Sequence, residues 1–598
     1  MPFDQQDCRQ TISNWIDEFN NYINSPFDHQ NEGKNLFLVD SFWRDALGLT
    51  WKLDTYVGNK DIFETIRKNA AMINLSDIEL DCEASPPQWV NRAGTDAIEA
   101  FIKFETKDAN GRGIIRLCEA TKKVDKDANG PHWRAWTFFT AIDSLKDHQE
   151  QIDRNRPTGS SYSRDFRGPN WLDERIAAQQ YDNRDPAVLV VGGGQAGLSI
   201  AARLTQLGID TLIVDKNSCI GDNWRNRYHA LTLHNQLHVN HLPYVPFPPT
   251  WPTYIPKDML ALWFESYAAI MELNFWTETE FTGATYDETE QRWSAELTKP
   301  DGRKRQIRPR HIVMATSVSG IPKMPAIPTL ENFDGEVMHS GKYTSAAGRQ
   351  GSNVLIIGTG TSGHDVAQDL QSNGAHPTLV QRSPTSVINV EPSAQLPYTL
   401  YAEDLTLETK DLIAAATPLQ PLKEAHRLMA EESTRLDTDL LEGLTANGFK
   451  IDRDDVYGWQ FKFMNRGGGY YFNVGCSDLI VDGKVGLIQY DDIETFVAKG
   501  AKLRDGTVIP ADTVILATGY KTQEEMVKKL LGKDIADRVG AIWGWDEDAQ
   551  ELNNMWTRTG QPGLWFIAGS FAQCRIYSKY LGLQIKACLE GLISPKRR

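Results

Sequence analysis

The chain contains 598 residues, of which 41% are hydrophobic and 24% are charged, and its formal net charge is −16. At roughly 100–200 residues per domain, this length predicts about three to four folded domains. The excess of acidic residues opposes binding to the phosphates of nucleic acid or to an anionic membrane surface. The one tight basic stretch, residues 302–310, leads into an apolar strand, so we interpret it as a solvated strand start.

The apolar runs and the cysteines indicate the setting of the protein. No run approaches the roughly 18 apolar residues that cross a bilayer, and residues 1–10 lack a basic head followed by an apolar core. We therefore expect a cytoplasmic protein without a membrane span. The cysteines form no CxxC pair and show no metal-ligand spacing, which predicts reduced thiols and no metal site. The seven cysteines are Cys8, Cys82, Cys118, Cys219, Cys476, Cys574 and Cys588.

Residues 1–150 combine helix-like stretches with alternating strand-like ones and predict a small α+β domain. Its clustered tryptophans are expected to fill the core and not to line a ligand cage. The polar segment that follows, rich in Arg, Ser, Gly and Pro, predicts a linker over residues 151–184. The tryptophans are Trp43, Trp51, Trp133 and Trp136.

An apolar strand, a glycine turn, a helix and a second apolar strand open the next predicted domain, residues 185–343. In such a turn the first glycine permits the tight bend, the second lets the backbone approach a pyrophosphate, and the third lets the helix pack on the strand. Asp215 ends the second strand, 23 residues after the first glycine, where a carboxylate binds ribose hydroxyls. The predicted cofactor contacts are Gly192, Gly194, Gln195, Ala196, Gly197, Asp215 and Lys216.

The same pattern returns at residues 353–382 and predicts a second dinucleotide-binding domain over residues 344–490. Here the strand after the helix ends in Gln381 and Arg382 in place of a carboxylate. A guanidinium pairs with a 2′-phosphate, whereas a carboxylate repels it, so this strand end favours NADPH over NADH. The alternative is a solvated arginine at a strand end. The predicted contacts are Gly358, Gly360, Thr361, Ser362, Gly363, Arg382 and Ser383.

Residues 491–598 return to strand-like patterns at 513–520 and 563–569. This order predicts that the chain completes the first dinucleotide-binding domain after the second has been inserted into it. The predicted fold is therefore α/β, with two Rossmann-like domains, one inserted in the other, and an amino-terminal α+β domain.

Residues 220–248 carry a pattern that generic dinucleotide binding does not explain. A Gly-x-x-Trp-x-x-Arg-Tyr run is followed by Leu-x-Leu-His and a proline-rich segment. This stretch resembles the FAD-contacting region of the class B flavin-dependent monooxygenases. The resemblance implies that Trp224, Arg225 and His234 contact FAD. Packing of the aromatic residues in the core is compatible with that role.

Residues 333–343 match the FxGxxxHxxx(Tyr/Phe) fingerprint of the N-oxygenating flavin monooxygenases through Phe333, Gly335, His339 and Tyr343. The related Baeyer–Villiger monooxygenases have Trp at the last position. His339 is a catalytic candidate by its place in this motif. We expect it to position NADPH and the junction of the two domains, and a hydrogen-bonded structural histidine is the alternative.

The resemblance extends over about residues 185–595 and implies the reaction. NADPH would reduce FAD, oxygen would form a flavin hydroperoxide, and this species would oxygenate a soft nucleophile, N or S, of a small organic substrate. In the family an asparagine near the flavin protects the intermediate; here the candidate is Asn235, with His234 as the alternative. The sequence departs from the family at Ser317, where glycine is usual, and at residues 567–573, which contain no acid.

Residues 1–150 lie outside this resemblance. They look like a cone-shaped domain of the nuclear-transport-factor type, which implies a structural role or a homodimer formed through this domain. The helical stretch 400–448 and residues 467–472 are expected to shape the substrate pocket. Two other functions stay open: a Baeyer–Villiger monooxygenase acting on a ketone, and a non-catalytic flavoprotein. The missing CxxC pair opposes a disulfide-type reductase.

Overall fold

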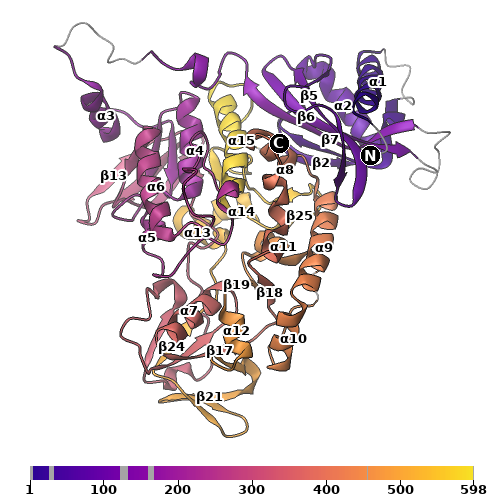
Figure 1. Cartoon of the computed structure of the whole chain (residues 1–598). Helices are drawn as coiled ribbons and strands as arrows, with labels where there is room; N and C mark the ends of the chain where they lie inside the picture. The colour runs from indigo at the N-terminus through magenta and orange to yellow at the C-terminus, as the bar shows by residue number, and fades with distance from the viewer. Residues whose placement is uncertain (1–3, 26–32, 121–131, 159–166, 454–455, 597–598) are drawn as a thin grey trace.

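The computed structural model of the chain describes residues 4–25, 33–120, 132–158, 167–453 and 456–596. Three large sheets organise this part of the chain, and helices pack between and around them (Figure 1). Within the described residues, no helix is both long and apolar enough to cross a membrane.

The amino-terminal unit is a seven-stranded sheet of order β2-β1-β7-β6-β5-β3, with β4 paired to β5. Helices α1 (Gln5–Asn24) and α2 (Asn59–Ile73) cover one face, and their apolar residues share a core with those of the strands. Trp43 is fully buried, and the other three tryptophans of the cluster are half-buried. The strands are β1 (Phe37–Ala46), β2 (Leu53–Val57), β3 (Glu79–Leu80), β4 (Gln88–Arg92), β5 (Thr95–Glu105), β6 (Ala109–Ala120) and β7 (His132–Leu145).

The first parallel unit is a Rossmann-like five-stranded sheet of order β10-β9-β8-β14-β27. Helix α4 (Gln195–Gln206) follows β8 and packs against α15 (Phe571–Leu589) near the end of the chain. Four of its strands are buried along their whole length, as expected for parallel strands covered on both faces. The strands are β8 (Val188–Val191), β9 (Thr211–Val214), β10 (Asn274–Trp276), β14 (His311–Met314) and β27 (Leu564–Phe566).

The second parallel unit is a five-stranded sheet of order β15-β24-β16-β17-β20, with α7 (Thr361–Ser372) after β16. The boundaries expected from the sequence, at residues 343 and 491, would assign β15 and β24 to the other parallel unit. In the structure β24 pairs with both β16 and β15, so both strands belong to the second sheet. The strands are β15 (Glu336–His339), β16 (Asn353–Ile357), β17 (His376–Gln381), β20 (Gly486–Gln489) and β24 (Thr513–Leu516).

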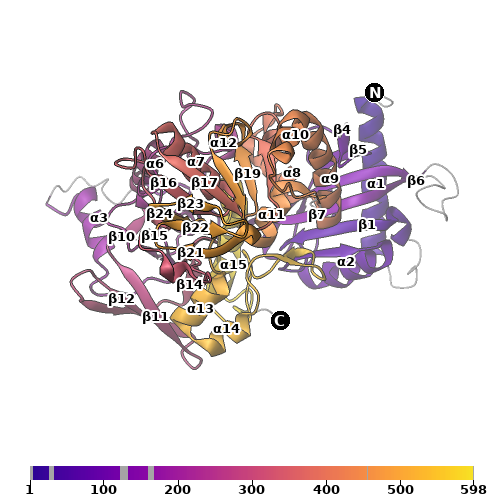
Figure 2. The ribbon, with the colours of Figure 1, turned by 90° about the horizontal axis from the view of Figure 1, so that it is seen from below.

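Three helices lie in the stretch 400–448 that is expected to be helical, and a fourth follows it. They are α8 (Leu407–Ala415), α9 (Leu419–Leu436), α10 (Thr438–Ala446) and α11 (Gly458–Arg466). Of these, α8 and α9 lie beside the amino-terminal sheet in both views (Figures 1 and 2). The other helices and strands of the described chain are α3 (Trp171–Gln180), α5 (Asp222–Arg225), α6 (Lys257–Ile270), β11 (Glu280–Asp287), β12 (Arg292–Thr298), β13 (Lys304–Ile307), β18 (Ser386–Asn389), β19 (Tyr470–Asn473), α12 (Cys476–Val481), β21 (Ile493–Val497), β22 (Gly500–Leu503), β23 (Val508–Pro510), α13 (Gln523–Leu531), α14 (Lys533–Val539), β25 (Trp545–Asp546) and β26 (Glu551–Leu552).

A buried ion pair joins the amino-terminal unit to the end of the chain. Arg44 of β1 contacts both carboxylate oxygens of Glu551 of β26 at 2.6 Å. The same guanidinium donates to the carbonyl oxygen of Ala415 and to the hydroxyl of Tyr577. Because a buried ion pair is stable only when its remaining donors are satisfied, this complete set of partners fixes β1 against α8 and α15.

Candidate nucleotide-binding and active site

The first glycine turn, between β8 and α4, has the geometry that the sequence predicts for dinucleotide binding. Gly192 has a φ of +107°, and a Cβ atom there would lie 2.5 Å from the carbonyl oxygen of Ala315. A Cβ atom at Gly197 would lie 1.9 Å from the carbonyl oxygen of Gly192. Gly194 is the N-cap of α4 and provides no side-chain cap, which leaves the N–H groups of the first turn available to an anion.

Asp215 follows β9 and faces this turn. Its Oδ2 accepts a hydrogen bond from the N–H of Gly193 at 2.8 Å, and its Oδ1 accepts one from the N–H of Asn217 at 2.8 Å. Each carboxylate oxygen has a further lone pair, so the side chain can also accept hydrogen bonds from ribose hydroxyls. Gln195 and Ala196 lie in the first turn of α4, and Lys216 is exposed.

Two buried polar atoms of neighbouring residues on α5 have no hydrogen-bond partner within the described chain. They are Nε1 of Trp224 and Oδ1 of Asn223. The amide nitrogen of Asn223 would lie 3.0 Å from a Cβ atom at Gly194, which places this side chain at the turn. Buried polar groups without partners are costly. The unpartnered Oδ1 of Asn223 therefore fits a polar ligand such as FAD at this turn.

Arg225, another predicted cofactor contact, is engaged within the protein. Its guanidinium forms ion pairs with Asp222 of α5 and with Glu265 of α6. Its carbonyl oxygen accepts a hydrogen bond from Nζ of Lys257 at 2.9 Å. Arg225 thus holds α5 against α6.

The second glycine turn, between β16 and α7, repeats the geometry of the first. Gly358 has a φ of +120°, and a Cβ atom there would lie 2.3 Å from the carbonyl oxygen of Ala517. A Cβ atom at Gly363 would lie 2.1 Å from the carbonyl oxygen of Gly358. Gly360 is the N-cap of α7, again without a side-chain cap. Thr361 Oγ1 donates to the carbonyl oxygen of Tyr470 at 3.1 Å, and Ser362 is half-buried.

The two residues at the end of β17 have different environments. Gln381 is buried, and its side-chain amide forms two hydrogen bonds with the backbone of Lys450, at 2.9 and 2.7 Å. Arg382 and Ser383 are exposed, and Arg382 has no ion pair in the described chain. The Arg382 guanidinium is thus accessible, whereas the Gln381 side chain is engaged by backbone.

His339, at the end of β15, uses both ring nitrogens to bind backbone. Nδ1 accepts the N–H of Gly341 at 3.0 Å, and Nε2 lies 3.0 Å from the carbonyl oxygen of Gly519. Burial lowers the pKa of His339, so the ring is neutral and its proton lies on Nε2. This geometry connects the fingerprint loop to the segment after β24.

Of the other fingerprint residues, Phe333 and Tyr343 are buried in the second parallel unit and Gly335 is half-buried. Phe333 packs in a core that includes Leu355, and a Cβ atom at Gly335 would lie 2.4 Å from the Phe333 ring. The hydroxyl of Tyr343 donates to Asp369 of α7 at 2.5 Å. Tyr343, which separates the two monooxygenase groups at the level of sequence, therefore anchors the loop to α7.

Both candidates for the position beside the flavin lie against the same group of aromatic rings. Asn235 Nδ2 donates to the hydroxyl of Tyr398 at 3.1 Å. The His234 ring packs edge-on against Phe472, with 5.7 Å between centroids. Tyr398 and Phe472 belong to one buried cluster with Trp459. The structure thus brings Asn235 and His234 together at this cluster.

Arg575 of α15, which no local sequence pattern predicts, holds the residues that follow His234 and Asn235. Its guanidinium donates to the carbonyl oxygens of Val239 at 2.8 Å and His241 at 2.7 Å. It also forms a buried bidentate pair with Asp411 of α8, at 2.7 Å. The partners are 164 residues apart in the chain, and no local pattern connects them.

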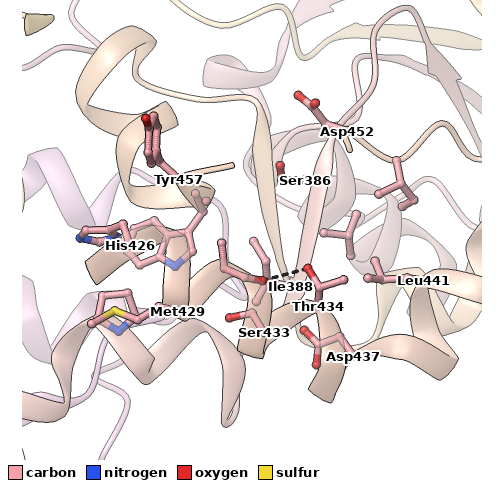
Figure 3. A pocket seen from close by; sticks show the side chains of 16 residues that line it. Ser386, Ile388, His426, Met429, Ser433, Thr434, Asp437, Leu441, Asp452 and Tyr457 are labelled. Atoms are coloured by element: carbon pink, nitrogen blue, oxygen red, sulfur yellow. Dashed lines mark hydrogen bonds between the residues drawn. The ribbon is translucent and has the colours of Figure 1, made fainter. Parts of the chain in front are cut away.

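A cavity of about 70 Å³ lies between β18, α9 and α11 (Figure 3). Its lining is mixed: apolar side chains such as Met429 and Leu441 alternate with polar ones that include His426 and Asp437. Burial lowers the pKa of His426 to about 4, so this ring is neutral near pH 7. The ring of Trp459, which lines the cavity, lies 6.0 Å from the ring of Tyr398, which bonds Asn235, so the cavity is next to the candidate site.

The chain thus has two glycine turns of the dinucleotide-binding type, one at the carboxyl end of each parallel sheet, and the His339 contact lies within the second unit. The described residues contain no group of three side chains that could hold a metal ion. All seven cysteines are free, and none forms a CxxC pair.

Comparison with known proteins identifies the family. A family model described as pyridine nucleotide-disulphide oxidoreductase matches residues 189–402. The probable indole-3-pyruvate monooxygenase YUCCA3 of Arabidopsis thaliana is 30% identical over 339 residues, which are 56% of this chain and 73% of that protein. The indole-3-pyruvate monooxygenase YUCCA1 of Oryza sativa subsp. japonica is 28% identical over 352 residues, which are 59% of this chain and 80% of that protein.

Among solved structures, the fold is similar to that of a cyclohexanone monooxygenase crystallised with ε-caprolactone. The TM-score is 0.50 at 18% identity, and the match covers 68% of this chain and 88% of the other. The chain belongs to the family of class B flavin-dependent monooxygenases. It is an oxidoreductase whose cofactors are FAD and NADPH.

Proposed function

We propose that the protein uses NADPH and O₂ to oxygenate a small organic molecule at a soft nucleophile, N or S. The observation that supports this most is the presence of two glycine turns of similar geometry in one chain, together with the His339 loop of the family fingerprint, which is bound to the segment after β24. The bound flavin would supply the chemistry of oxygen activation, and the chain positions both cofactors and excludes water.

The residues around the first turn would hold FAD. The helix α4 N-terminus would bind the pyrophosphate, Asp215 the ribose hydroxyls, and the unpartnered Nε1 of Trp224 a polar atom of the cofactor. The proposed FAD contacts are Gly192, Gly194, Gln195, Ala196, Gly197, Asp215, Lys216, Trp224 and His234. Arg225 acts indirectly, because its guanidinium is occupied by two carboxylates.

The residues around the second turn would hold NADPH. The α7 N-terminus would bind the pyrophosphate, and Arg382 would pair with the 2′-phosphate that distinguishes NADPH from NADH. The proposed contacts are Gly358, Gly360, Thr361, Ser362, Gly363, Arg382 and Ser383. His339 is a positioning residue in this proposal, because both of its nitrogens bind backbone.

Asn235 or His234 would form hydrogen bonds at the reacting face of the flavin. Both side chains are half-buried against the aromatic cluster, which would exclude water from the reaction. The organic substrate would reach this face from the cavity of Figure 3. That cavity is lined by α9 residues, within the stretch that the sequence analysis assigned to the substrate pocket.

A second candidate function is oxygenation at a carbonyl carbon. The relatives at 28–30% identity are named for indole-3-pyruvate, which is a 2-oxo acid. Tyr343 favours the heteroatom reaction at the level of sequence, but in the structure its side chain contacts Asp369 and does not select a substrate directly.

A product assay separates these functions. The FAD-loaded enzyme with NADPH and O₂ would be given a tertiary amine, a thioether, a ketone and indole-3-pyruvate in parallel. The proposal expects an N-oxide or S-oxide formed at one per NADPH consumed. Product from the ketone or the 2-oxo acid alone would establish the second candidate. NADPH that fails to bleach the bound flavin without oxygen would establish a non-catalytic flavoprotein.

We also propose that the amino-terminal unit, of nuclear-transport-factor type, has a structural role. The buried Arg44–Glu551 pair supports this role, because it ties the unit to α8 and α15. Arg575 of α15 in turn holds the segment that follows His234 and Asn235. Light scattering would test whether the unit also forms a homodimer.

A further inference from the structure

Tyr228 belongs to the first parallel unit but is buried in the core of the second. It follows α5 and belongs to one buried hydrophobic cluster with Val354, Val366 and Tyr471. Its hydroxyl donates a short hydrogen bond to Oδ2 of Asp365. Asp365 lies in the second turn of α7, the helix that begins at the second glycine turn. One hydrogen bond therefore connects the two units inside a core.

Asp365 is a buried carboxylate, and in the described chain it forms no ion pair. Burial raises its pKa; the hydrogen bond from Tyr228 opposes this rise, and the charge of Arg227, which also opposes it, acts beyond ion-pair distance. A buried charge without a cation depends on the hydrogen bonds that it receives. The contact from Tyr228 is therefore important for the position of α7 relative to the first unit.

The segment that carries Tyr228 is fixed on both sides. The N–H of His229 donates to the carbonyl oxygen of Thr344, in the second parallel unit, at 2.7 Å. The N–H of Leu233 donates to the carbonyl oxygen of Ile255, in the first unit, at 2.9 Å. The next residues along the chain are His234 and Asn235. The segment thus transmits the position of α7 to the proposed flavin face.

A second tyrosine provides a comparison on the same helix. Asp369 lies one turn after Asp365 and accepts a hydrogen bond from Tyr343 at 2.5 Å. Tyr343 belongs to the second parallel unit, like α7 itself. Of the two tyrosine–aspartate pairs on α7, only the pair of Tyr228 and Asp365 connects the two units.

We propose that Tyr228 and Asp365 are positioning residues that set the orientation of the two nucleotide-binding units for hydride transfer. This inference rests on the proposed function, in which FAD binds one unit and NADPH the other. Each cofactor would be anchored by its own glycine turn, so the distance between nicotinamide and flavin depends on how the units meet. A misplacement of about 1 Å can slow a reaction roughly a hundredfold, while the anchoring contacts stay intact.

The test uses the FAD-loaded full chain with Tyr228→Phe, which removes the hydroxyl and keeps the ring in the core. Flavin reduction by NADPH is followed without oxygen, and NADP⁺ binding is measured by calorimetry. We expect the limiting reduction rate to fall about tenfold, with the Kd for NADP⁺ within about twofold of the wild-type value, because only the geometry between the units changes. An unchanged rate, or a Kd weakened in proportion to the rate, would overturn the proposal.

Two further variants separate this role from general stability. Tyr181→Phe removes a phenol hydrogen bond of 2.6 Å to Asp210 within the first unit, and it should leave the reduction rate unchanged. Asp365→Asn combined with Tyr228→Phe should be no slower than Tyr228→Phe alone, because both changes remove one shared interaction. Multiplied rate losses in the double variant would contradict a shared role.

Hydrogen exchange gives a result that does not depend on NADPH. Tyr228→Phe should speed amide exchange in residues 228–233 and in α7, and leave exchange in α4 unchanged. Unchanged exchange in both segments would overturn the proposal even if the enzyme is active. Wild-type flavin that NADPH cannot reduce would instead reject the proposed function and leave the exchange test valid.

Discussion

His339 Nε2 donates a hydrogen bond of 3.0 Å to the carbonyl oxygen of Gly519, while Nδ1 accepts the N–H of Gly341. The histidine of the family fingerprint is thus held at a backbone junction. Its pKa is lowered by burial, so it stays neutral when the pH is near 7. We infer a positioning role and not proton transfer.

Replacing His339 by Gln tests this role. Glutamine can accept from Gly341 and donate to Gly519, so we expect most of the activity to remain and the pH profile of kcat/KM to keep its shape. His339→Ala should destabilise the fold by about 1–3 kcal/mol, because it leaves buried backbone groups without partners. An acidic limb in the wild-type pH profile that disappears in His339→Gln would show that His339 transfers protons.

Arg382 is predicted to select NADPH. Arg382→Ala should weaken NADPH binding by roughly ten- to a hundredfold, from the loss of charge-assisted hydrogen bonds to the 2′-phosphate, and leave NADH binding unchanged. Isothermal titration calorimetry with NADPH and with NADH measures the ratio of the two dissociation constants. Arg303→Ala, which removes an exposed arginine from the turn before β13, is the control for loss of surface charge. Equal weakening of NADPH and NADH would contradict a 2′-phosphate contact.

Asn235 and His234 are predicted to differ in their effect on coupling. The residue that faces the flavin should, when replaced by Ala, raise the hydrogen peroxide released per NADPH, because the reaction loses a hydrogen bond and admits water. The other replacement should alter stability only. Peroxide and product are measured in the same reaction. Unchanged coupling in both variants would remove this segment from the active site.

Breaking the Arg44–Glu551 pair should loosen the amino-terminal unit. Glu551→Gln leaves a buried guanidinium without an anion, which costs about 3–5 kcal/mol. Asp143→Asn breaks the half-exposed pair with Lys579 and should cost no more than about 1 kcal/mol. The thermal unfolding and protease resistance of the Glu551→Gln and Asp143→Asn chains are compared with those of the wild type. Equal losses would show that the buried pair has no special role in docking.

Buried neutral histidines predict loss of stability in acid. Burial lowers the pKa of His311 to about 3 and those of His364 and His426 to about 4. In the unfolded chain these groups take up protons near pH 6.5, so stability is full above that pH and falls below it, by about 2 kcal/mol per histidine between pH 7 and 5. Asp45, whose pKa is raised to about 6, opposes this by about 1 kcal/mol. Denaturant unfolding at pH 7 and pH 5 measures the difference, and equal stability would contradict it.

The parts of the site that local sequence determines could be predicted. Gly192 and Gly358 lie at turns whose backbone geometry only glycine adopts without collision, so their spacing is informative. Arg382 follows a strand by a fixed offset and is exposed as expected. The boundaries of the inserted unit cannot be predicted in the same way, because the apolar pattern of β24 does not indicate which of the two parallel sheets it joins.

Residues that act through tertiary contacts could not be predicted. Arg225 lies in a family motif, yet its charge is satisfied by Glu265, which only the packing of α5 on α6 brings near. Asp365 is separated from Tyr228 by 137 residues, and nothing in either local pattern indicates the other. Such pairs form where two units dock. Docking depends on the shapes of the two surfaces more than on the hydrophobic periodicity of either segment.

The reaction of the reduced enzyme with oxygen tests the central claim most directly. The FAD-loaded protein is reduced by NADPH without oxygen, mixed with O₂ while NADP⁺ is bound, and followed by flavin absorbance. If the enzyme shields its flavin from water, the oxidised spectrum should return only after a delay. An oxygenated substrate should shorten that delay. Immediate return of that spectrum, with one hydrogen peroxide released per flavin, would contradict the account.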